Sequence, residues 1–211
     1  MTRIIYVIMA AVLLLLYLSA CSQRQRQGDD FFAAQRYEMA ADLYVKSAEQ
    51  GDTDKMMRLG EMYAAGKIGY KRDYENAVYW YKKAAEHGIV RAMFELGFIY
   101  EYGQGEVIQN DAEAEHWYKQ AAAHNDAYSQ YRLAEVMARQ LDDYEGEAAI
   151  KAYRWFLIAE RTAGDCKDNP LCRIVSDDKF NYRWELQRHL KPDQQSQALQ
   201  LAKQWSAEET R

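Results

Sequence analysis

Histidine and cysteine are the residues of this chain best suited to chemistry, and their spacing argues against an active site. The 211-residue sequence contains four histidines and three cysteines. No histidine stands in an H-E-x-x-H metal motif or beside a nucleophile motif, and the sequence contains no P-loop and no dinucleotide fingerprint. Glu115 and His116 are adjacent and have side chains that could act as an acid–base pair, but such neighbours are expected on any exposed helix. The sequence therefore predicts no enzyme, no cofactor and no metal site.

Residues 1–20 have the character of a cleavable secretion signal. Arg3 gives a positive start, an apolar run follows, and small residues precede Cys21. This pattern resembles a bacterial lipoprotein signal with its lipobox. The resemblance implies cleavage before Cys21 and lipid on that cysteine. With Ser rather than Asp at position 22, it implies an outer-membrane lipoprotein whose body faces the periplasm. The alternative is an uncleaved transmembrane anchor, although residues 4–20 are at the short end for a span.

The two remaining cysteines form a local pair. Cys166 and Cys172 flank five residues that include the turn-forming dipeptide Asn169-Pro170. In the oxidising periplasm such a pair favours a disulfide, which would close a loop at residues 164–173. The competing interpretation is a metal or redox site. The C-x₅-C spacing matches no standard metal motif, and no histidine lies close by in the sequence.

Composition and charge favour a helical protein that does not bind nucleic acid. The chain has only two prolines, and Ala, Glu, Gln and Lys, which favour helices, are abundant. Loss of the signal removes Arg3 and changes the net charge from −5 to −6, since 26 basic residues then face 32 acidic ones. No basic tract exceeds a pair, which argues against nucleic acid as a partner.

A repeat of 37 residues organises the chain. The pairs Leu43-Tyr44, Trp80-Tyr81 and Trp117-Tyr118 are each 37 positions apart, and Trp155-Phe156 follows after 38. A second set of similar pairs recurs with the same period, at Leu59-Gly60, Leu96-Gly97 and Leu133-Ala134. Self-similarity at such a period indicates a solenoid of stacked helical units. The fold class predicted is all-α, an α/α superhelical solenoid of helix-turn-helix repeats with atypical capping helices at its C-terminal end.

Helix boundaries recur at the same period. Gly51, Gly88 and Asn125 each follow a helical pattern and are suited to end it. Asp73 and Asn110 each precede the next helical pattern and are suited to cap its first turn. The predicted organisation is a signal peptide at 1–20, a lipidated tether at 21–30, a solenoid at 31–163, a disulfide loop at 164–173 and C-terminal capping helices at 174–211.

The middle repeats carry a family signature. The sequence WYKKAAEHG at residues 80–88, followed by Leu96-Gly97 and Gly103-Gln104-Gly105, resembles a Sel1-like repeat, and the resemblance covers residues 34–163. It implies a superhelix that mediates protein–protein contacts. Bacterial envelope members of this kind act as adaptors in signalling, secretion, polysaccharide export or wall remodelling. The third repeat departs from the pattern, since it lacks the Gly-x-Gly loop and has Met137 in place of tyrosine.

Positions that have the same kind of residue in successive repeats are expected in the core. Equivalent positions whose residue differs from repeat to repeat are expected to contact partners. The residues predicted to be structural are Trp80, Trp117, Leu96, Tyr63 and Tyr100. The variable columns lie on the first helix of each repeat, which is expected to line a groove. The groove residues predicted are Asp42, Tyr79, Lys82, His116, Lys119 and Arg154. Their side chains suit a peptide or an acidic segment, and the alternative is an ordinary solvated helix face.

Together these patterns predict a non-enzymatic adaptor that holds envelope proteins together, attached to the membrane by lipid on Cys21. The alternative function is binding of peptidoglycan fragments or another small envelope ligand. The two differ in a simple way: a small ligand added alone should raise the melting temperature, whereas an adaptor needs its protein partner.

Overall fold

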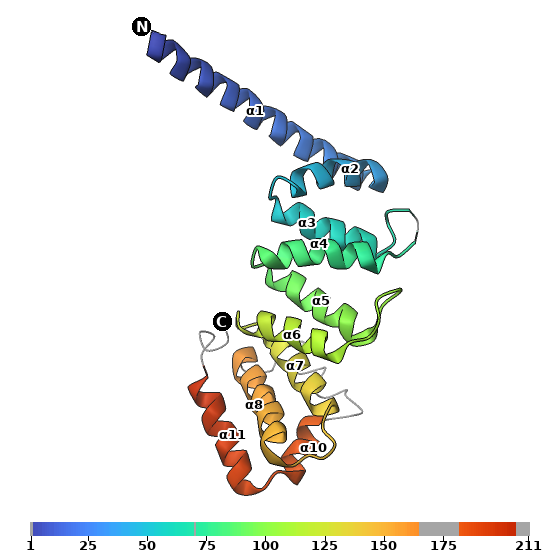
Figure 1. The fold of residues 1–211 in the computed structure, drawn as a ribbon, viewed down its shortest axis with the longest axis vertical. Coiled ribbons are helices and arrows are strands. Elements are labelled where there is room, and N and C mark those ends of the chain that lie inside the picture. Colours follow the sequence, from blue (N-terminus) through green and yellow to red (C-terminus); the bar gives the residue numbers. More distant parts are fainter. Residues whose placement is uncertain (1, 70, 165–181, 206–211) are drawn as a thin grey trace. The chain divides into compact units, whose positions relative to one another are not determined.

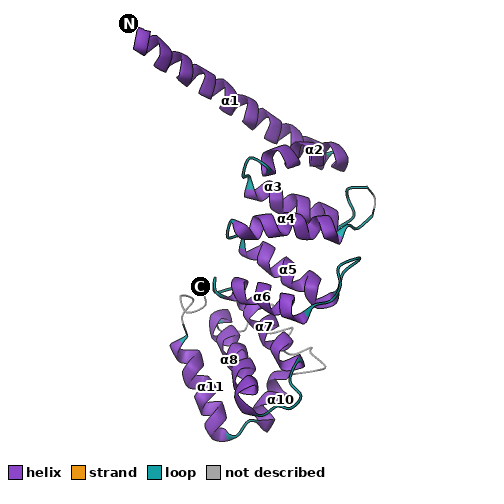
Figure 2. Cartoon of the chain, in the orientation of Figure 1, coloured by secondary structure: helices purple, strands orange, loops and turns teal. Residues whose placement is uncertain are grey.

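The computed structural model describes residues 2–69, 71–164 and 182–205, and the regular elements in these ranges are all α-helices (Figure 2). The chain divides into two compact units, Met1–His87 and Gly88–Arg211. Among the described residues, no helix combines the length and the apolar character that crossing a membrane requires.

The first unit consists of four helices that pack in chain order (Figure 1). Contacts join α1 to α2, α2 to α3 and α3 to α4, as expected for a stack of helix-turn-helix repeats. The helices are α1 (Thr2–Ala33), α2 (Tyr37–Ala48), α3 (Thr53–Ala64) and α4 (Tyr74–Glu86). Residues 21–30, for which a tether was predicted, lie within α1.

The second unit continues the same pattern of consecutive packing and ends in two further helices. Its helices are α5 (Val90–Tyr102), α6 (Asp111–Ala122), α7 (Ala127–Arg139), α8 (Gly146–Ala163), α10 (Tyr182–His189) and α11 (Pro192–Gln204). Helices α5 to α8 pack in succession, α11 lies against α8, and α10 contacts α7 and α8. Ala198, Ala202 and Trp205 of the last segment are buried, as expected for a capping helix. The predicted disulfide, Cys166–Cys172, lies outside the described residues.

The predicted helix boundaries are confirmed. The carboxylate of Asp73 accepts a hydrogen bond from the Asn76 backbone N–H at 2.9 Å, and Asn110 caps α6 in the same way. The Asn76 backbone, followed by its side chain, lowers the pKa of Asp73. Gly51, Gly88 and Asn125 all have positive φ, at 95°, 80° and 60°. The left-handed backbone at Asn125 is adopted at little cost by asparagine, which explains how it replaces glycine there.

The second member of the repeated pair is buried in every repeat, and the first member is also buried in two repeats, at Trp80 and Trp155. Tyr44, Tyr81, Tyr118 and Phe156 are all buried. The sequence-based choice of tryptophan is therefore wrong for Trp117, which is only partly buried. Trp80 and Leu96 are buried as predicted, whereas Tyr63 and Tyr100 are also only partly buried.

Each core tyrosine presses against a glycine of the preceding helix. A Cβ added to Gly60 would lie 2.5 Å from the Tyr81 ring, and one added to Gly97 would lie 2.6 Å from the Tyr118 ring. Real Cβ atoms do not approach carbon so closely, which accounts for the small-residue column. A Cβ added to Gly28 would likewise lie 2.9 Å from the Tyr44 ring. The end of α1 therefore occupies the place that the second helix of a preceding repeat would take.

A buried ionic network reinforces this contact in the second unit. The Glu101 side chain is fully buried, and its carboxylate accepts a hydrogen bond from the Tyr118 hydroxyl at 2.9 Å. The same carboxylate pairs with Arg132 at 2.6 Å and with Arg139 at 3.0 Å. Burial, together with the Glu101 carboxylate, raises the pKa of Tyr118 well above its ordinary value. Arg132 also pairs with Glu135, and the network thus ties α5, α6 and α7 together.

The first unit contains a smaller version of this network. Asp29 accepts a hydrogen bond from the Tyr44 hydroxyl at 2.7 Å and from the Lys55 ammonium at 2.6 Å. Although burial alone would raise the pKa of Asp29, these two hydrogen bonds lower it. The ring of Phe32 packs against Tyr37 at 5.4 Å between centroids. The end of α1 is thus joined to α2 and α3 by both polar and apolar contacts.

Candidate functional site

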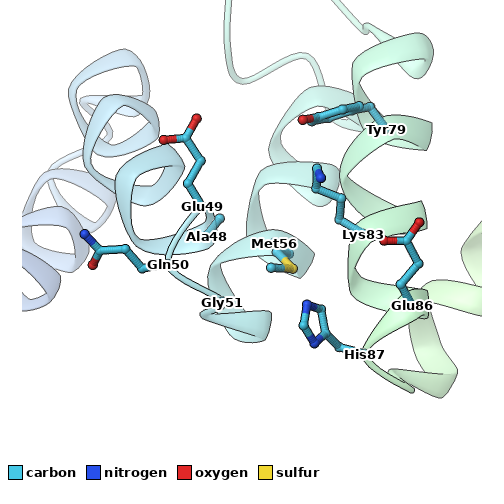
Figure 3. Close-up of a pocket in the computed structure, with 9 residues that line it drawn as sticks. All are labelled: Ala48, Glu49, Gln50, Gly51, Met56, Tyr79, Lys83, Glu86 and His87. Atoms are coloured by element: carbon cyan, nitrogen blue, oxygen red, sulfur yellow. The ribbon is translucent and has the colours of Figure 1, made fainter.

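Each unit contains a cleft between the first helices of two successive repeats. In the first unit, the α2–α4 cleft has a volume of about 460 Å³. Figure 3 shows Glu49 and Gln50 at the end of α2 on one side, Tyr79 and Lys83 of α4 on the other, and Met56 between them. The complete lining is Ala48, Glu49, Gln50, Gly51, Met56, Tyr79, Lys83, Glu86 and His87.

The chemistry of the α2–α4 cleft is that of a mixed surface. The Tyr79 side chain is 51% exposed, and its ring meets the Trp80 ring edge to face at 5.1 Å. The Lys83 ammonium lies 5.3 Å from the centre of the Tyr79 ring, within the range of a cation–π contact. The lining contains two glutamates and one lysine, together with a histidine. An exposed aromatic ring beside mixed charges suits contact with a peptide.

The α6–α8 cleft of the second unit combines an apolar floor with a basic rim. Its volume is about 410 Å³. The floor contains Leu133, Trp155 and Trp205, all of them buried, and Lys119 stands exposed at the rim. The complete lining is Glu115, Lys119, Leu133, Met137, Lys151, Arg154, Trp155 and Trp205.

The structure brings together two of the six predicted groove residues. Lys119 of α6 and Arg154 of α8 line the same cleft, and Tyr79 lines the other. The other three predicted residues, Asp42, Lys82 and His116, are not among the residues that line these two clefts. The exposed His116 ring instead contacts neighbours on its own helix, with Gln120 Nε2 at 2.8 Å from its Nε2.

Several lining residues were missed by the sequence analysis. Lys83 and His87 follow Tyr79 at intervals of four, and Lys151 precedes Arg154 by three. These spacings place side chains on one helical face, so helical periodicity could have identified them. Trp205 lies after the last described helix and has no equivalent in the repeats. No signal in the sequence connects it to the α6–α8 cleft.

The described part of the chain has no arrangement suited to metal chemistry. Within it, no group of three or more His, Cys, Asp or Glu residues is placed to hold a metal ion. What the two clefts offer is surface for recognition: aromatic rings, an apolar floor, and Lys, Arg and Glu side chains at the rims.

The family assignment follows from matches to four successive repeats. The model of the Sel1 repeat matches residues 31–52, 56–89, 90–126 and 127–161, which is more than half of the chain. The chain belongs to the Sel1 repeat family. The predicted fold class, an all-α solenoid of Sel1-like helix-turn-helix repeats, is thereby confirmed. Among curated protein sequences, none matches this chain.

Two solved structures resemble this Sel1 repeat protein. A Sel1 repeat protein from Oxalobacter formigenes is 25% identical, with a TM-score of 0.50 over 84% of this chain and 69% of that one. A protective antigen present in uropathogenic Escherichia coli strains, which displays the SLR fold, is 19% identical with a TM-score of 0.51. The second match covers 89% of this chain but only 54% of the antigen, so the chain spans about half of that relative.

Sel1 repeat proteins generally mediate protein–protein interactions, and the family is generally one of non-enzymatic scaffolds. The two clefts fit this role, because they expose aromatic and charged side chains on helices that the core holds rigidly.

Proposed function

We propose that this Sel1 repeat protein is a non-enzymatic adaptor that holds protein partners together in the bacterial envelope. The observation that supports this most strongly is the position of the clefts. Each opens between the first helices of successive repeats, where an extended segment of another protein can contact two repeats at once. Complexes for wall remodelling, secretion, export or signalling are the settings in which such an adaptor would act.

The proposed location is the outer membrane, with lipid on Cys21 and the body facing the periplasm. The first 21 residues support it through their resemblance to a lipoprotein signal. Gly28, seven residues after Cys21, already packs against Tyr44. At a rise of about 1.5 Å per helical residue, only about 10 Å of helix separates the two positions. A lipid on Cys21 would therefore hold the first unit close to the membrane surface.

The test is chemical crosslinking of the tagged protein in its native envelope, followed by mass spectrometry of the captured proteins. We expect a small, reproducible set of partners, whose capture weakens several-fold in Tyr79→Ala/Lys119→Ala, which changes one exposed residue of each cleft, without a lower melting temperature. The Cys21→Ser variant should remain unprocessed and carry no lipid. Both substitutions in the first variant are at exposed positions, so loss of capture would not reflect unfolding.

Three results would count against the proposal. Capture of abundant envelope proteins alone, unchanged in the double variant, would contradict the adaptor role. A rise in melting temperature on adding peptidoglycan fragments without any protein would favour the small-ligand alternative. A Cys21→Ser protein that is membrane-bound in the same form as wild type would overturn the lipid anchor.

A further inference from the structure

The α6–α8 cleft has an excess of positive charge, although the chain as a whole is acidic. Lys119, Lys151 and Arg154 face a single acid, Glu115, in its lining, whereas the net charge of the chain is −5. The α2–α4 cleft has no such excess, since its lining contains two glutamates and one lysine. A cleft lined mainly by one sign of charge attracts the opposite sign.

The lysines at the rim are available to a ligand. Lys119 is exposed. Lys151 pairs with Glu147 at 2.7 Å, but both side chains are more than half exposed. An exposed pair of this kind contributes little, so a ligand carboxylate can take the place of Glu147 at small cost.

The floor of the cleft is apolar and fixed in position. The rings of Trp155 and Trp205 meet at 68°, with centroids 5.6 Å apart. Arg161 holds the end of α11 in place, because its guanidinium donates to the carbonyl oxygens of Ala202 at 2.5 Å and Trp205 at 3.2 Å. A volume of about 410 Å³ above such a floor is enough for a large side chain inserted from a passing segment.

We infer that the α6–α8 cleft binds an acidic segment of a partner protein that inserts one aromatic or large aliphatic side chain between Lys119, Lys151 and Arg154. This inference rests on the proposed adaptor function and specifies the chemistry of the partner. The acidic groups pair with the three cations through charge-assisted hydrogen bonds. The inserted side chain covers the apolar floor at Trp155 and Trp205.

The test uses a labelled eight-residue peptide with one central phenylalanine flanked by aspartates and glutamates, and it measures binding by fluorescence anisotropy. Lys119→Glu/Lys151→Glu should weaken binding at least tenfold. The matched control is Lys46→Glu/Lys191→Glu, which reverses two exposed charges outside the cleft and should leave binding within about twofold. Binding should also weaken with added salt and on replacing the phenylalanine by alanine. The melting temperature of each variant shows that it is folded.

Three results would overturn the inference. The first is equal binding by both double variants, or equal binding of a peptide with lysines in place of the acids. The second concerns residues 206–211, which follow Trp205, lie outside the described residues and include Glu208 and Glu209. If the peptide binds only to Glu208→Gln/Glu209→Gln, the occupant is the chain's own acidic end. If no peptide binds while envelope partners are still captured, the acidic segment is wrong and the adaptor role remains.

Discussion

Replacing Glu101 by alanine should destabilise the second unit by about 3 kcal/mol, because it leaves the largely buried Arg132 guanidinium, together with that of Arg139, without their shared carboxylate. The carboxylate is fully buried and joins Arg132, Arg139 and the Tyr118 hydroxyl. Arg132 retains Glu135 and Arg139 retains Asp111, so the effect should fall at the lower end of the range for a broken buried pair. In a chain of this length, we expect a fall in melting temperature of roughly 6–12 °C.

The matched control for this prediction is Glu95→Ala on the same helix. Glu95 pairs with Arg91 at 3.8 Å, and the Arg91 side chain is largely exposed. Its loss should change stability by less than about 1 kcal/mol. Thermal unfolding followed by circular dichroism measures both variants. Equal melting temperatures for Glu101→Ala and Glu95→Ala would show that the buried network does not stabilise the unit.

Gly97→Leu should have an effect at least as large, about 3 kcal/mol or more, because the new side chain has no room beside Tyr118. A single Cβ at this position would already lie 2.6 Å from the Tyr118 ring. The higher helix propensity of leucine would offset less than about 1 kcal/mol of this penalty. Urea unfolding of the variant should therefore show a clearly lower midpoint.

Two further variants test whether the loss of stability comes from the clash with Tyr118 rather than from any large side chain added to a helix. Ala112→Leu adds the same bulk at an exposed position of α6 and should change stability by less than about 0.5 kcal/mol. In a Tyr118→Ala background, Gly97→Leu should be tolerated far better than in the wild type, because the new side chain then has space. Additive effects of the two substitutions would mean that the Gly97–Tyr118 contact does not limit packing.

The repeat period was enough to predict the fold, because each repeated feature has a local physical cause. Gly51, Gly88 and Asn125 adopt left-handed backbone where a helix ends, and Asp73 and Asn110 cap the helices that follow. The aspartate caps of the second helices, Asp52 and Asp126, went unnoticed. Their signal was present, since each follows directly after a residue that ends a helix.

Choosing the core residue within each aromatic pair was harder. Adjacent helical positions differ by about 100° in direction, so a tryptophan and the tyrosine after it cannot point the same way. The glycines at positions 60 and 97 were the signal that identifies the tyrosine. A glycine that recurs at the same place in successive repeats indicates that a large side chain packs against it, and Tyr81 and Tyr118 do so here. Contacts across long sequence separations, such as Glu101 with Arg139, have no local signature.

The candidate site was only partly predictable, because part of its lining comes from outside the repeats. Lys119 and Arg154 were identified because they occupy variable columns of the repeat, and both line the α6–α8 cleft. Trp205 directly follows the last of the closing helices, which have no repeat period, and only the fold brings it to this cleft.

The most direct test of the central claim is photo-crosslinking from single positions in living cells. A photoreactive amino acid would replace Tyr79 in one cleft, Lys119 in the other, and Ile108, which is 85% exposed and lines neither cleft. We expect discrete protein adducts from positions 79 and 119 and none from position 108. Absence of protein adducts at both cleft positions, or the same adducts at all three, would contradict the claim that this Sel1 repeat protein holds its partners in its clefts.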